Sequence, residues 1–122
     1  MVTNVTSFGR SGLYDWVVQR VSAVILLLYI LFLAFIFITR PDMQYQEWRA
    51  LFASNPVRIF TLIALLSLCA HAWIGMWTIA TDYLTSKMLG ASANKVRFVF
   101  ELLCLAVLFV YVVWGVQILW SI

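Results

Sequence analysis

Three long apolar stretches, separated by short polar segments, dominate this sequence. They run from Val21 to Ile38, from Ile59 to Ala80 and from Phe98 to Trp120. Each is close to the roughly 20 residues that an α-helix needs to cross the hydrocarbon of a bilayer. The pattern predicts an all-α protein with three transmembrane helices and a single membrane domain over residues 1–122, the second helix continuing to about residue 83.

The composition agrees with a membrane location. The chain of 122 residues is 65% hydrophobic and 11% charged, and its mean hydropathy is +1.00. A single small soluble core cannot hold that much apolar surface. The net charge of +3 is small and scattered, which argues against a nucleic-acid partner. The short segments outside the spans leave no room for a soluble catalytic domain.

The N-terminal segment and the first loop carry signals of their own. Arg10, Asp15 and Arg20 interrupt the start of the chain and no small-residue cleavage site follows the first apolar stretch, so we expect that stretch to stay as an anchor. Residues 11–20 are expected to form a short helix at the membrane surface that leads into the first span. Asn55 followed by Pro56 predicts the start of the second membrane helix, with Asn55 as its cap.

The first loop also contains aromatic residues at helical spacing. Tyr45, Trp48 and Phe52 recur in this way, which predicts a second interfacial helix with its rings at headgroup depth.

The basic residues divide unequally between the two sides of the membrane. Five of the eight fall on the side of the N-terminus and the second loop, and three fall on the side of the first loop: Arg10, Arg20, Lys87, Lys95 and Arg97 against Arg40, Arg49 and Arg58. The positive-inside rule then favours a cytoplasmic N-terminus and a periplasmic C-terminus.

His71, the only histidine in the chain, stands in the middle of the second apolar stretch. An imidazole buried in hydrocarbon needs a partner: it either hydrogen-bonds a neighbouring helix or serves as a cofactor ligand or proton relay. Gly75, Thr78 and Asp82 lie within roughly 40° of His71 around the helix axis, so the four share a face. A haem bound by His71 would need its second axial histidine from another polypeptide. Since the sequence has no C-x-x-C-H signature, coordination and packing alone would hold it.

Three further polar residues each have a structural and a functional interpretation. Asp82 lies near the end of a helix, where the macrodipole disfavours negative charge, so it is either solvated by headgroups or used chemically. Tyr83 suits the aromatic belt of a membrane protein, or it donates a hydrogen bond to a quinone. Arg20, at the start of the first span, binds a lipid phosphate or a haem propionate.

Two tryptophans inside the second span lie on a different face of the helix from His71. Trp73 and Trp77 lie at about 200° and 240° from His71 on the helical wheel. We therefore expect them to pack against other helices or lipid, away from any ligand of His71.

The run H-A-W-I-G-M-W-T-I-A-T-D-Y, from His71 to Tyr83, and the run G-R-S-G-L-Y-D-W-V-V-Q-R, from Gly9 to Arg20, resemble the hydrophobic membrane anchor subunits of bacterial succinate dehydrogenase. The resemblance implies half of a heterodimeric membrane helical bundle, with one haem b held between His71 and a histidine of the other half. It also implies a quinone-binding role for Tyr83 with Asp82 beside it, and places Arg20 near the haem propionates.

The same resemblance implies partners and a location. They are a cytochrome b membrane subunit, a flavoprotein subunit that oxidises succinate, an iron-sulfur subunit that passes electrons to ubiquinone, and phospholipid of the bacterial cytoplasmic membrane. The chain would serve the tricarboxylic acid cycle and the respiratory chain with no succinate chemistry of its own. Two alternatives remain open: a fumarate reductase anchor, and a non-redox three-span assembly or transport subunit.

Overall fold

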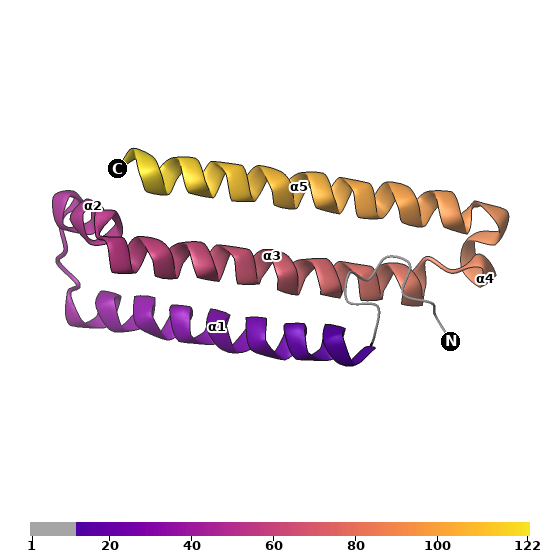
Figure 1. Ribbon diagram of the computed structural model, residues 1–122, viewed down its shortest axis with the longest axis horizontal. Coiled ribbons are helices and arrows are strands. Elements are labelled where there is room, and N and C mark those ends of the chain that lie inside the picture. Colours follow the sequence, from indigo (N-terminus) through magenta and orange to yellow (C-terminus); the bar gives the residue numbers. More distant parts are fainter. Residues whose placement is uncertain (1–11) are drawn as a thin grey trace.

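The computed structural model describes residues 12–122, and these form a single layer of long helices (Figure 1). The three long helices are α1 (Gly12–Thr39), α3 (Asn55–Tyr83) and α5 (Ala93–Ser121). Neighbouring helices run antiparallel, and α3 lies between α1 and α5 and contacts both. All three are long and apolar enough to cross a membrane, which confirms the predicted all-α fold with three spans.

Short helices connect the long ones at the two ends of the layer (Figure 1). At one end α2 (Tyr45–Ala53) joins α1 to α3, and it confirms the helix predicted from the aromatic spacing of the first loop. At the other end α4 (Ser86–Leu89) and the 3-10 helix η1 (Gly90–Ser92) lead from α3 into α5. Gly90 has a φ of +65°, a conformation that glycine adopts without strain, and it ends α4.

Two predicted details of the helix starts are wrong. Helix α1 is continuous from Gly12, so the described part of residues 11–20 is no separate surface helix; no proline or glycine interrupts the chain between Gly12 and Thr39. Ser11 and Arg10 lie outside the described residues. Helix α3 starts where expected, but its N-cap is Ser54 rather than Asn55, and the Ser54 hydroxyl donates to the carbonyl of Leu51.

Few side chains are buried within the described layer. They are mostly small: Ile36, Ala64, Ala80, Ala93 and Leu119 among the hydrophobic residues, and Ser22 and Ser67 among the polar ones. Small residues let neighbouring helices approach closely in a membrane. Gly115 of α5 lies close to α3, where an added Cβ would run into the side chain of Leu65.

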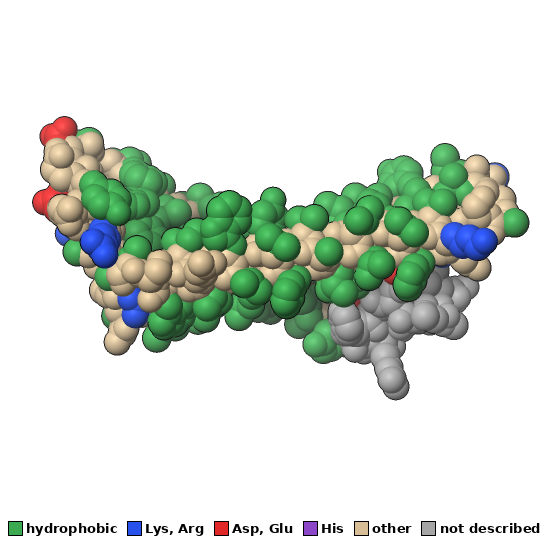
Figure 2. All heavy atoms as spheres, turned by 90° about the horizontal axis from the view of Figure 1, so that it is seen from above, with side chains coloured by type: hydrophobic (Ala, Val, Ile, Leu, Met, Phe, Trp, Pro, Cys, Tyr) green, Lys and Arg blue, Asp and Glu red, His purple; other side chains and the backbone are tan. Residues whose placement is uncertain are grey.

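Most large apolar side chains point outward from the layer. Phe35 is 67% exposed and Phe109 68% exposed. Figure 2 shows hydrophobic side chains along the length of the molecule, while Lys and Arg gather at its two ends. A surface of this kind is stable only against lipid or other apolar helices.

Candidate functional site

His71 projects from the middle of α3 towards α1. Its Nδ1 lies 3.1 Å from the hydroxyl oxygen of Ser22. Its Nε2 lies 3.4 Å from the side-chain amide nitrogen of Gln19, which precedes Ser22 by one turn of α1. The imidazole therefore belongs to the interface between α1 and α3, with a polar contact at each ring nitrogen.

The two contacts of the imidazole differ in quality. The Ser22 hydroxyl is within the usual hydrogen-bond range and its residue is 4% exposed. The Gln19 contact is longer than an ordinary N–H···N bond, and the other amide atom of Gln19, Oε1, is buried without a hydrogen-bond partner. Nε2 is thus the weakly engaged nitrogen of the ring.

The helix face beyond His71 is open. Gly75 follows one turn later, and an added Cβ there would meet no atom within 4 Å. Thr78, a further turn on, is exposed and its hydroxyl donates to the carbonyl of Ile74. A weakly held nitrogen, an unpartnered amide oxygen and an open glycine face fit a large flat cofactor that takes one ligand from this chain. Residues 12–122 hold no cluster of three or more side chains able to bind a metal ion.

Both interpretations of His71 from the sequence find support in this geometry. The hydrogen bonds to α1 are those expected of a histidine that joins two helices. The poor contact at Nε2 is what a ligand nitrogen needs in order to be released to a metal. The two interpretations therefore differ in what Nε2 binds rather than in where the side chain lies.

Arg20 lies on α1 directly after Gln19. It is exposed, and its guanidinium carbon lies 5.4 Å from the ring centroid of Trp16. A guanidinium stacked in this way keeps its N–H donors free to bind an anionic group outside the chain. A lipid phosphate and a haem propionate both meet that description.

Asp82 and Tyr83 occupy the last two positions of α3. Both are exposed, Tyr83 at 63%. Eleven residues separate Asp82 from His71, which corresponds to about 16 Å along the helix axis. The pair therefore lies at the end of the helix, away from the imidazole.

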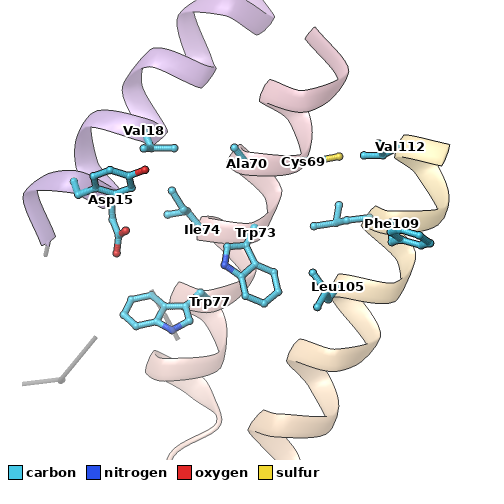
Figure 3. A pocket seen from close by; sticks show the side chains of 12 residues that line it. Asp15, Val18, Cys69, Ala70, Trp73, Ile74, Trp77, Leu105, Phe109 and Val112 are labelled. Carbon is cyan, nitrogen blue, oxygen red and sulfur yellow. The ribbon is translucent and has the colours of Figure 1, made fainter. Parts of the chain in front are cut away.

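The cavity shown in Figure 3 lies elsewhere, between α1, α3 and α5. Its volume is about 410 Å³ and its lining is mainly apolar. Trp73 and Trp77 line it and His71 does not, which confirms that the two tryptophans point away from the imidazole. Asp15 contributes a carboxyl group to the lining, a placement that was not predicted from the sequence.

Sequence reasoning also missed Ser22 and Gln19. They lie 49 and 52 residues from His71 in the chain, so only the pairing of α1 with α3 brings them to it. A signal was present, because two polar residues three positions apart at the start of an apolar helix share one face.

The sequence was compared with known proteins. Residues 3–113 match a family model described as succinate dehydrogenase/fumarate reductase transmembrane subunit. The chain is 39% identical to the succinate dehydrogenase hydrophobic membrane anchor subunit of Coxiella burnetii over 111 residues, 91% of this chain and 90% of that protein. A subunit of the same description from Rickettsia bellii is 30% identical over 95 residues, 75% of this chain and 68% of that protein.

Proposed function

Because this chain belongs to the succinate dehydrogenase/fumarate reductase transmembrane subunit family, we propose that it anchors a succinate:quinone oxidoreductase and supplies one ligand to haem b and part of a quinone-reduction site. It is a multi-pass membrane protein and a subunit of an enzyme complex. The observation that carries the proposal is the imidazole of His71, held by α1 at Nδ1 and only weakly engaged at Nε2.

His71 would hold the haem through Nε2, with the second ligand from a cytochrome b membrane subunit. When bound, the haem supplies one-electron redox chemistry at a fixed place in the membrane. The chain's own part is to fix the imidazole against α1, to leave room for a flat ring at Gly75, and to offer Arg20 to a propionate. The chain contains one histidine, so a haem held between two histidines requires a partner chain.

Tyr83 and Asp82 would act on the quinone. Reduction of a quinone to a quinol takes two electrons and two protons, and the electrons arrive from an iron-sulfur subunit. The phenol of Tyr83 donates a hydrogen bond to a quinone carbonyl, which favours the build-up of negative charge on that oxygen. The carboxyl group of Asp82, next in the chain, passes protons to the reduced oxygens. The exposure of both side chains supports this role, because a quinone and a partner subunit can reach them.

The outward-facing apolar surface supports a partner within the membrane. The layer is one helix thick, and only seven of the described residues are buried. A second membrane subunit packed on the layer would complete a helical bundle, with phospholipid over the remainder. The excess of basic residues favours a cytoplasmic N-terminus, and in that orientation Tyr83 and Asp82 would meet the iron-sulfur and flavoprotein subunits on the cytoplasmic side of the bacterial membrane.

The fumarate reductase alternative uses the same chemistry in the opposite direction. The matching family model includes both kinds of subunit, whereas the two relatives described above are named for succinate dehydrogenase. Those relatives therefore favour succinate oxidation as the working direction.

An absorbance spectrum of the complex, purified with its partner subunits, tests the proposal. We expect the sharp reduced bands of a six-coordinate b-type haem, and we expect His71→Ala to abolish or alter them. Cys69→Ala, two residues away on α3 and facing the cavity with the tryptophans, is the matched control and should leave the bands unchanged. Unaltered bands in the His71→Ala complex would falsify the ligand assignment.

A further inference from the structure

The hydroxyl group of Ser22 takes part in two close contacts. It lies 3.0 Å from the carbonyl oxygen of Gln19 on its own helix and 3.1 Å from Nδ1 of His71 on α3. A serine hydroxyl carries one hydrogen and two acceptor lone pairs. Because a carbonyl oxygen can only accept, a hydrogen bond to Gln19 uses the single hydrogen of Ser22, and the contact with His71 then requires a hydrogen on Nδ1.

The same assignment fits the other side of the ring. With its hydrogen on Nδ1, a neutral imidazole has a lone pair on Nε2. The atom near Nε2 is the side-chain amide nitrogen of Gln19, which is a donor. The long contact of 3.4 Å therefore pairs a donor with an acceptor. The whole network is consistent with one tautomer, and its weak member is the one at Nε2.

We propose that Ser22 is a positioning residue for the haem ligand: its hydroxyl accepts the Nδ1–H of His71 and thereby presents Nε2, with its lone pair, to the iron. The inference rests on the proposed function, since it concerns the haem that His71 would hold. Ser22 is well suited to this role because it is 4% exposed and its own hydrogen is fixed on the α1 backbone.

This hydrogen bond has two consequences for the iron. It fixes the orientation of the imidazole plane, and it makes Nε2 a stronger electron donor. A stronger donor stabilises the ferric state over the ferrous state, so the bond lowers the reduction potential of the haem. Loss of such an outer partner typically costs about 10- to 100-fold in metal affinity.

The test is a redox titration of the haem in the purified complex, followed by its absorbance bands. Ser22→Ala should shift the midpoint potential to a more positive value and reduce the haem retained per complex. Ser22→Thr keeps the hydroxyl, and Ser22→Val has nearly the same shape without it. We expect the threonine variant to keep a midpoint potential close to that of the parent. The midpoint potential of the valine variant should become more positive, as in Ser22→Ala. Ser67→Ala, which removes another buried serine one turn before His71, is the control and should leave the potential unchanged.

The outcomes separate this inference from the proposed function. If His71→Ala removes the haem bands while the threonine and valine variants have equal potentials, the positioning role is wrong and the ligand assignment stands. If His71→Ala leaves the bands unchanged, the proposed function itself is wrong. The comparison of threonine with valine remains decisive if Ser22→Ala does not assemble, because the two side chains have nearly the same volume and differ in the hydroxyl group.

Discussion

The two interfaces of α3 are built in different ways. Towards α1, the contacts are polar as well as apolar: His71 meets Ser22, and the Tyr29 hydroxyl lies 2.8 Å from the Thr61 hydroxyl. Towards α5, Gly115 lets the side chain of Leu65 approach the backbone within the span. At the end of the helices, Arg58 donates a hydrogen bond to the carbonyl oxygen of Ile122. A polar interface in a membrane costs free energy unless its groups are paired, so it is retained where the groups have a further use.

The difference between the two interfaces suggests that α1 and α3 together position the candidate ligand, whereas α3 and α5 mainly pack against each other. The α1–α3 interface holds the only histidine of the chain, with one ring nitrogen well bonded and the other weakly engaged. In the α3–α5 interface, α5 packs closely on Leu65 of α3 at Gly115. The polar contact of Arg58 with Ile122 lies at the end of the helices. We therefore expect substitutions at the contacts of His71 in the first interface to change the haem, and substitutions at the second interface to change the stability of the assembly.

The largest effect on stability is expected at the α3–α5 interface. Gly115→Val places branched side-chain atoms where Leu65 already packs, and overpacking of this kind costs about 1–3 kcal/mol. The thermal dissociation temperature of the purified complex should fall while the haem spectrum keeps its shape. Adding Leu65→Ala to Gly115→Val should restore part of the loss by reopening the space. A double variant no more stable than Gly115→Val alone would contradict the proposed contact.

A residue outside both interfaces should affect turnover without affecting stability. Tyr83→Phe removes the proposed hydrogen bond to the quinone, a loss of about 1.4 kcal/mol, or tenfold in rate, if that bond acts in the transition state. Quinone reduction should fall by about that factor, while succinate oxidation with an artificial soluble acceptor stays at the parent level. Tyr111→Phe, an exposed tyrosine on α5, is the matched control. Equal loss with both acceptors would point to faulty assembly instead of a quinone contact.

The smallest effect is expected at the second polar contact of the α1–α3 interface. Tyr29→Phe removes the hydrogen bond to Thr61 and keeps the ring, which packs edge-on against Phe60 with centroids 5.1 Å apart. Hydrogen bonds between membrane helices are worth about 0.6 kcal/mol on average. The dissociation temperature should fall slightly, and the haem potential should not move. A shift in potential as large as that of Ser22→Ala would mean that the interface responds as a whole rather than through Ser22.

The sequence by itself determined the fold class and the candidate residues. Apolar stretches of membrane-spanning length define the three spans, because a helix is the simplest way for a chain to satisfy its backbone hydrogen bonds in lipid. Helical periodicity also separated Trp73 and Trp77 from the His71 face, since positions on one helix are fixed by its geometry.

Only the tertiary structure decided which residues meet across helices. Nothing in the local sequence relates Ser22 and Gln19 to His71, because the contact depends on the register in which α1 packs against α3. The same holds for Gly115 and Leu65, and for the place of Asp15 in the cavity lining. The helix starts also differed from prediction: α1 is continuous from Gly12 because no residue breaks it, and the N-cap of α3 is Ser54. Periodicity defines the faces of each helix, whereas packing of side chains between helices selects which faces touch.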